Sequence, residues 1–163
     1  MAGTTIIRKD AAPSISAGSD SHTFRVGSEV SGGSFTYLEA TIGYLGGPPL
    51  HSHLEQDEVI HVLEGRLKVQ YGTQIVDLDA GDAIYFPRRV PHAFTNLDPE
   101  TPVRTIGLST PGGFDEFMAE WVAWLETGAR DQEKLLEMCR RHKMGVSGPP
   151  LPVTLGLVPA GVA

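Results

Sequence analysis

Two stretches of the chain carry the pattern that decides its fold. The first is residues 46–58, GGPPLHSHLEQDE, which runs on through an apolar segment to Gly65, and the second is residues 81–92, GDAIYFPRRVPH, which runs on to Asn96. Glycine and proline interrupt both stretches, and short runs of apolar and β-branched residues follow each of them. This composition is typical of short strands separated by turns.

Three histidines and one glutamate in these stretches are suited to binding a transition metal. Side chains two apart on a strand share a face, so His51 and His53 project together. Glu58 opens the next expected strand and His92 opens another one far along the chain, and a closed β-barrel is the simplest structure that brings these strand starts to one interior point. Imidazole and carboxylate suit one divalent ion of Fe, Ni, Mn, Co or Cu, or Zn for a non-redox reaction. Such a site keeps positions open for a substrate or for O2.

Composition limits the classes of function. The 163 residues suffice for one domain with its own core, and the net charge of −7 argues against nucleic acid or an anionic membrane as a partner. The single cysteine, Cys139, excludes an intrachain disulfide and is expected to face a core. We find no apolar run of membrane-spanning length and no signal-peptide pattern at the N-terminus, so we expect a cytoplasmic protein.

Strand-like segments fill the chain as far as residue 110. They fall at 22–26, 34–44, 58–63, 66–71, 73–78, 83–86, 92–96 and 103–109. So many short strands predict an all-β sandwich or barrel and not a βαβ fold.

The periodicity changes after Pro111. Apolar residues recur at helical spacing over 113–125, and a second helix is expected over about 131–143. The apolar face of the first helix is expected to pack against the barrel. We therefore divide the chain as follows: an N-terminal arm or edge strand at 1–21, the barrel at 22–110, two C-terminal α-helices packed on it at 111–145, and an irregular, Pro- and Gly-rich tail at 146–163.

On these residues the chain resembles the cupin superfamily. The first cupin motif reads here as His51-x-His53, four residues, Glu58, six residues, Gly65, and the second runs from Gly81 through Pro87 and His92 to Asn96. The resemblance covers roughly residues 35–109. It implies a cupin β-barrel, a double-stranded β-helix or jelly roll, in which the three histidines and Glu58 bind one metal ion.

Two positions depart from the family pattern. The motifs have glycine where this chain has Leu45 and Arg89. At the first position, Gly46 and Gly47 follow Leu45, which allows the turn to shift by one residue. If the position of Arg89 needs a positive φ, arginine costs conformational energy there.

Within the cupins, the chain looks like small quercetinase-like proteins, on the stretch 48–65 and on the later segments 111–117 and 148–152. The resemblance implies a metal-dependent dioxygenase that acts with O2 on a flavonol-like, phenolic or enolisable substrate. It also implies that Glu58 is both a metal ligand and the catalytic base that takes the substrate hydroxyl proton.

Two other classes of function remain open. One is a non-redox metal-dependent cupin, such as an isomerase, cyclase or lyase, in which the metal polarises a carbonyl. The other is a ligand-binding or sensory cupin without turnover. We expect a small-molecule substrate and no nucleic-acid or membrane partner, and on resemblance alone we expect a homodimer.

Strand alternation suggests which side chains face the cavity. Ile60 and Val62 share the face of Glu58, and Phe94 shares that of His92. The sequence does not decide which face of strand 34–44 points inward, and Tyr37 is its candidate for the substrate cavity. We expect His61, His22 and His142 to lie outside the site, and Arg88 and Arg89 to belong to a solvated turn.

Overall fold

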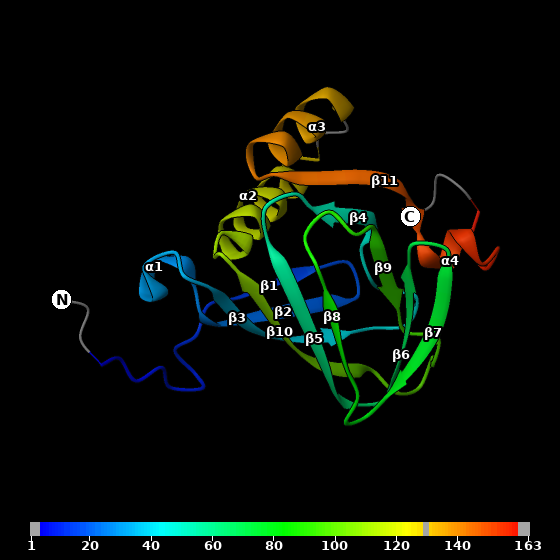
Figure 1. Cartoon of the computed structure of the whole chain (residues 1–163), viewed down its shortest axis with the longest axis horizontal. Coiled ribbons are helices and arrows are strands. Elements are labelled where there is room, and N and C mark those ends of the chain that lie inside the picture. Colours follow the sequence, from blue (N-terminus) through cyan, green and yellow to red (C-terminus); the bar gives the residue numbers. More distant parts are fainter. Residues whose placement is uncertain (1–3, 129–130, 160–163) are drawn as a thin grey trace.

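Two antiparallel sheets form the frame of the molecule (Figure 1). The computed structural model describes residues 4–128 and 131–159; the remaining parts of the predicted arm, helical segment and tail (1–3, 129–130 and 160–163) lie outside the described residues. The six-stranded sheet has the order β1 (Ser14–Ala17), β2 (Asp20–Val26), β3 (Thr36–Ile42), β10 (Val103–Thr110), β5 (Asp57–Glu64), β8 (Ala83–Phe86). The five-stranded sheet has the order β11 (Met144–Pro150), β4 (Pro49–His53), β9 (His92–Thr95), β6 (Arg66–Tyr71), β7 (Gln74–Asp79).

The helices are α1 (Ser28–Ser31), α2 (Phe114–Glu126), α3 (Gln132–Arg141) and α4 (Leu151–Thr154). Helices α2 and α3 lie together over the top of the barrel in Figure 1, while α1 and α4 lie at opposite sides of it. The all-β jelly roll with two C-terminal helices, as expected from the sequence, is confirmed. No helix in the described part of the chain is long and apolar enough to cross a bilayer.

The core lies between the two sheets. Its buried members come from both sheets and from α2, and they include Leu38, Ile42, Val62, Leu67, Val69, Phe86, Val103 and Met118. Cys139 on α3 is a free thiol that is only 4% exposed, as expected for a core-facing cysteine.

Helix α2 is fixed over the barrel by a carboxylate in its first turn. Asp115 accepts hydrogen bonds from the backbone N–H of Ser28 (2.9 Å), from the Ser28 hydroxyl (2.6 Å) and from the Thr36 hydroxyl (2.8 Å). Burial acts to raise the pKa of Asp115, but these hydrogen bonds outweigh it and the net pKa is lowered. The start of α2 is therefore tied to α1 and β3, which sets where its apolar side chains fall.

The tail differs from the sequence prediction. Residues 146–150 are not irregular: together with Met144 and Gly145 they form β11, which pairs with β4 in the register Met144↔His53, Gly145↔Ser52 and Val146↔His51. This pairing satisfies backbone groups along the edge of a strand that bears two histidines of interest. The short helix α4 follows, with Leu151 buried. The division of the chain into arm, barrel, helices and tail stays a prediction.

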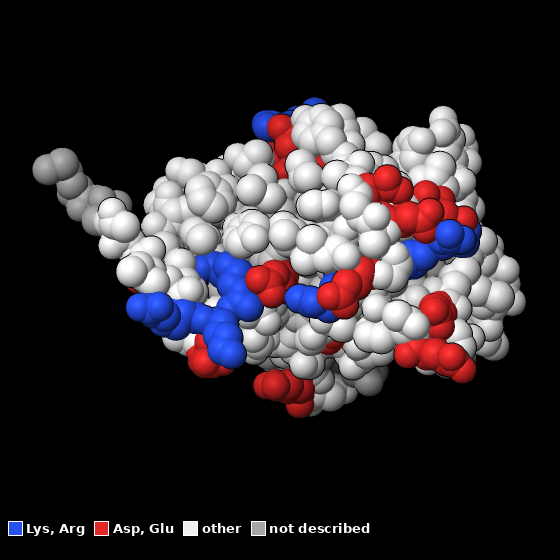
Figure 2. All heavy atoms as spheres, turned by 90° about the horizontal axis from the view of Figure 1, so that it is seen from below, with Lys and Arg blue, Asp and Glu red and all other residues white. Residues whose placement is uncertain are grey.

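The outer face of the six-stranded sheet carries charges of both signs. Arg25 pairs with Glu39 across β2 and β3 (3.0 Å), and Arg104 pairs with Glu64 across β10 and β5 (2.6 Å). Figure 2, which views the molecule from below, shows basic and acidic side chains interspersed on that side and no uniform basic surface there. Such pairs fit a solvated sheet face and contribute little to stability.

Both positions where the chain departs from the family glycines have left-handed backbone. Leu45 has φ 57° and Arg89 has φ 70°. The turn at Arg89 is still formed, since its N–H donates to the carbonyl of His53 (2.7 Å). The motif therefore marks a real backbone requirement, which this chain meets at an energetic cost.

Replacing Arg89 with glycine is expected to stabilise the protein by about 0.5–1 kcal/mol. Relief of the left-handed strain, of order 1–2 kcal/mol, exceeds the entropic cost of a glycine in the unfolded chain. The measurement is the free energy of unfolding in urea. The matched control is Arg88→Gly, in the same exposed turn, which is expected to destabilise because Arg88 hydrogen-bonds to Asp57 (3.0 and 3.1 Å). Equal effects of the two substitutions would contradict this account.

Candidate metal centre

The barrel brings the four predicted ligands together. One potential ligand atom from each of His51, His53, Glu58 and His92 lies within 4.8 Å of the others. His51 and His53 lie on β4, and Glu58 lies at the start of β5. His92 lies at the start of β9, where it is the register partner of His51. The three rings are at most 5% exposed, so the group is enclosed.

Each imidazole is oriented by an acceptor at Nδ1. His51 Nδ1 lies 2.9 Å from the carbonyl of Pro49, and His92 Nδ1 lies 2.9 Å from the carbonyl of Val90. A carbonyl only accepts, so both Nδ1 atoms must carry the proton and donate. In the neutral ring this leaves the Nε2 lone pair of each histidine free to bind a metal.

His53 is oriented by a glutamine, which the sequence analysis did not identify. Gln56 Nε2 donates to the carbonyls of Pro111 (3.0 Å) and Gly112 (2.8 Å), so its Oε1 must face the ring of His53, at 3.1 Å from Nδ1. His53 therefore also donates from Nδ1 and presents its lone pair at Nε2. That Nε2 is buried and has no hydrogen-bond partner among the described residues.

Glu58 faces these lone pairs at close range. Its Oε2 lies 2.9 Å from His92 Nε2 and 3.2 Å from His53 Nε2. If both rings are neutral and protonated on Nδ1, the Nε2 lone pairs point at the carboxylate oxygen. Two hydrogen-bond acceptors then face each other, which is repulsive. A positive charge between them, either a proton or a metal ion, removes this conflict, so the residues present fit a bound divalent cation.

The electrostatics of the cluster favour a cation as well. Burial, together with the nearby rings of His92 and His53, lowers the pKa of His51 to about 3, so this ring is neutral at pH 7. Burial acts to raise the pKa of Glu58, but its interactions with His53 and His92 outweigh burial and hold the pKa well below the ordinary value. Burial acts to lower the pKa of His53, but the interaction with Glu58 is stronger and the net pKa is raised. The carboxylate is therefore ionised among enclosed imidazoles, an arrangement that attracts a cation.

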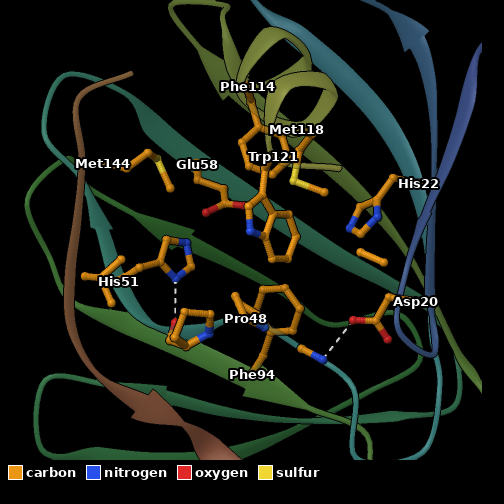
Figure 3. A pocket seen from close by; sticks show the side chains of 14 residues that line it. Asp20, His22, Pro48, His51, Glu58, Phe94, Phe114, Met118, Trp121 and Met144 are labelled. Atoms are coloured by element: carbon orange, nitrogen blue, oxygen red, sulfur yellow. Dashed lines mark hydrogen bonds between the residues drawn. The ribbon is translucent and has the colours of Figure 1, made fainter. Parts of the chain in front are cut away.

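A cavity of about 130 Å³ opens onto the cluster (Figure 3). His51 and Glu58 form part of its wall, and Asp20 and His22 lie at the other side in this view. The remaining lining is mostly apolar and includes Pro48, Phe94, Phe114, Met118, Trp121, Met144 and Val146. Helix α2 and strand β11 thus close the barrel mouth with apolar side chains.

One wall of this cavity is a glycine turn held by Asp20. The carboxylate accepts from the N–H groups of Gly43 (3.1 Å) and Gly47 (2.8 Å). A Cβ at Gly47, where φ is 118°, would lie 1.8 Å from the backbone oxygen of Phe94. Glycine is therefore required there by close backbone approach, and the turn positions Pro48 and Pro49 beside the cluster.

The candidates for the cavity wall have different outcomes. Phe94 lines the main cavity, and Ile60 lines a smaller space that adjoins it. Val62 faces the interior but is fully buried in the packed core. The prediction for Tyr37 is wrong: the buried residues of β3 alternate from Thr36 to Ile42, so Leu38 and Ala40 point inward and Tyr37 points outward.

Of the histidines expected to lie outside the site, two do and one does not. His61 alternates with the inward residues of β5, and His142 contacts Glu120 (Nε2 to Oε2 2.8 Å) on α2. His22 lines the cavity, which the sequence analysis missed because strand β2 carries no part of either motif. Burial lowers the pKa of His22 to about 4, so the ring is neutral at pH 7.

The enclosure of His22 predicts a pH dependence of stability. Its folded pKa of about 4 lies below the ordinary value of about 6.5, so between these values the unfolded chain binds a proton that folded His22 does not. The free energy of unfolding should therefore fall as the pH drops from 6.5 to 4, by up to about 3 kcal/mol from this residue. His22→Gln should show a shallower fall in urea denaturation across this range. His51 also lowers the stability at acidic pH, but it does so equally in the wild type and in His22→Gln. If the free energies of unfolding of the two proteins changed in parallel with pH, His22 would not be enclosed.

Comparisons with known proteins agree with this geometry. A family model described as a cupin domain matches residues 41–109. An uncharacterised protein of Methanocaldococcus jannaschii is 31% identical over 62 residues, which are 38% of this chain and 49% of that protein. The chain therefore matches about half the length of this curated relative.

Solved structures share the fold at low identity. KdgF from Halomonas sp. has a TM-score of 0.59 at 17% identity, over 69% of this chain and 99% of that one. An RmlC-like cupin from Shewanella frigidimarina has a TM-score of 0.58 at 18% identity, over 71% and 98%. A sugar phosphate isomerase of the cupin superfamily from Silicibacter pomeroyi has a TM-score of 0.55 at 20% identity, over 65% and 75%. These likenesses concern the fold alone. Together with the family match, they show that residues 41–109 form a cupin domain with the cupin fold.

Proposed function

We propose that this protein is a metal-dependent dioxygenase of the quercetinase-like type, which acts with O2 on a phenolic or enolisable molecule. The observation that supports the proposal is that a candidate metal site and an apolar cavity lie side by side. His51, His53, Glu58 and His92 form a cluster suited to one metal ion, and the cluster borders a cavity lined mostly by apolar and aromatic side chains. A site of this kind suits an organic substrate that offers one oxygen to the metal and an apolar body to the wall.

The size of the cavity supports a small substrate. An apolar cavity of about 150 Å³ holds a benzene ring, and the space here is about 130 Å³. A single-ring phenol or a compact 1,3-diketone therefore fits better than a whole three-ring flavonol. This narrows the substrate class within the range that the sequence resemblance implies.

The charges around the cavity also limit the substrate. Its charged lining residues in the described part of the chain are Asp20 and Glu58, both acidic, and no lysine or arginine lines it. Arginine and lysine are the side chains that pair with phosphate, so this lining offers a phosphorylated sugar no cationic side chain.

The chain's own residues would divide the chemistry as follows. A metal ion bound by the three Nε2 atoms and Glu58 would supply Lewis acidity, and redox contact with O2 if it is Fe, Ni, Mn, Co or Cu. Glu58, whose low pKa keeps it ionised, is placed to accept the proton of a substrate hydroxyl. Phe114, Met118 and Trp121 of α2 cover the reacting group and limit access of water.

A second candidate is a non-redox cupin that moves protons, such as an isomerase, cyclase or lyase. The observation in its favour is that His22 and Glu58, two groups able to transfer protons, line the same cavity. This reaction would proceed without O2. A homodimer and a cytoplasmic location remain predictions from the sequence.

The test is oxygen uptake by apo-protein loaded separately with Fe, Mn, Co, Ni, Cu and Zn. The substrates are catechol, acetylacetone and a flavonol, and the controls are the double variant His51→Ala/His53→Ala and the matched variant His61→Ala. Uptake that needs a redox metal and both cluster histidines, but not His61, supports the dioxygenase. Conversion of a substrate in anaerobic buffer supports the non-redox enzyme, and tight binding without turnover in every metal form supports a sensory cupin.

A further inference from the structure

A small inner chamber adjoins the main cavity beside Glu58. Its volume is about 40 Å³, and it shares four wall residues with the main cavity, namely His22, Glu58, Phe94 and Phe114. The rest of its wall comes from β3, β5 and β10, and apart from Thr105 and Ser109 those side chains are apolar. A space of this size holds one water molecule or a single polar group, not a ring.

Two residues that line the chamber each carry a buried polar atom without a partner in the described part of the chain. His22 Nδ1 and Ser109 Oγ are buried and make no hydrogen bond among the described residues. Ser109 is 4% exposed and is the register partner of Glu58 across β10 and β5, which places it beside the metal cluster. Buried polar groups in native proteins are nearly always satisfied, by protein or by ordered water, because leaving one unsatisfied is costly. An oxygen atom in the chamber would give both groups a partner.

We propose that the inner chamber binds a second oxygen atom of the substrate and that His22 and Ser109 position it. The substrate class is then a molecule with two oxygens on neighbouring or next-neighbouring carbons, such as a catechol or the enol of a 1,3-diketone. One oxygen lies at the metal cluster and the other in the chamber, since Glu58 borders both spaces.

The geometry gives each residue a distinct part. Ser109 offers a rotatable hydroxyl that can donate to a carbonyl or a deprotonated oxygen. His22, on β2 at the far side of the cavity from His51 in Figure 3, offers one ring nitrogen as a donor and the other as an acceptor. Neither residue belongs to the metal cluster, so their removal should leave metal binding intact.

The inference rests on the proposed function only in placing the first substrate oxygen at the metal. Its test measures binding of the substrate and does not require oxidation. The probes are catechol and phenol, which differ by one hydroxyl, titrated into zinc-loaded protein with the fluorescence of Trp121 in the cavity wall as the signal. The variants are Ser109→Ala and His22→Phe, with His22→Gln as the conservative replacement. The matched controls are Ser14→Ala and His61→Gln, which change the same residue types outside the cavity, and zinc content is measured for every protein.

The wild type is expected to bind catechol more tightly than phenol, and each cavity variant should reduce this preference by about 3- to 10-fold, the value of one hydrogen bond. Phenol affinity, zinc content and both control variants should be unchanged, and His22→Gln should recover part of the preference. An unchanged preference in Ser109→Ala and His22→Phe overturns the inference, as does failure of the wild type to bind catechol. If oxygen uptake fails while the preference depends on these two residues, the proposed dioxygenase is wrong and the chamber assignment stands.

Discussion

Replacement of His53 with alanine is expected to lower the affinity for a transition metal by more than about a hundredfold. Loss of a residue that merely orients a ligand costs 10- to 100-fold, and loss of the ligand itself must cost more. The barrel cannot substitute another group, because His53 is 2% exposed and its Nε2 faces Glu58 at 3.2 Å. The measurement is a competition titration with a chelator, together with metal content after dialysis.

The control is His61→Ala, which removes a histidine from the outer face of β5 and should keep wild-type affinity. A second readout is thermal unfolding. Metal that binds only the folded state should raise the melting temperature of the wild type and of His61→Ala, and leave that of His53→Ala unchanged. Equal metal affinity in all three proteins would show that the cluster is not a metal site.

Replacement of Gln56 with leucine is expected to lower metal affinity by about 10- to 100-fold although Gln56 does not reach the metal. Its amide fixes His53 in the tautomer with the proton on Nδ1, and it also bridges to the backbone at Pro111 and Gly112, just before α2. Leucine fills a similar volume and provides no acceptor, so His53 loses its orientation. The neighbouring exposed residue gives the control, Glu55→Gln, which should bind metal as the wild type does.

A structural role alone would have a different signature. The ¹⁵N spectrum of the histidine rings reports the tautomer, and in the metal-free Gln56→Leu variant the His53 signals should shift toward mixed tautomers. If the variant is less stable but keeps the tautomer of His53 and its metal affinity, Gln56 serves only to anchor the loop at Pro111.

The sequence predicted the four-residue cluster in two ways: local strand geometry paired His51 with His53, and the spacing of the two motifs added Glu58 and His92 from other strands. Side chains two apart share a strand face, so the pair at His51 and His53 could be placed before any tertiary structure was known. The glycine position of the second motif is local as well: a positive φ was considered at Arg89, and the structure shows one there (70°). At Leu45 the turn does not shift to the following glycines, since Leu45 itself has φ 57°.

What the sequence could not supply depends on pairing between distant segments. Both faces of strand 34–44 carry large side chains, so alternation did not fix the phase; Glu39 lies outward with Arg25, which places Tyr37 outward too. His22 enters the cavity only because β2 pairs beside β3. The strand in the Pro- and Gly-rich tail exists because β4 offers it an edge.

The origin of the cavity walls has a consequence for how such proteins diverge. All four cluster residues lie within the matched segment 41–109, but much of the surface that a substrate would touch comes from outside it, from β2, α2 and β11. Reactivity and selectivity are therefore inherited from separate parts of one gene. A few substitutions in the flanking segments can give a relative with the same metal-binding motif a different substrate. The motif alone therefore does not identify the substrate of a cupin.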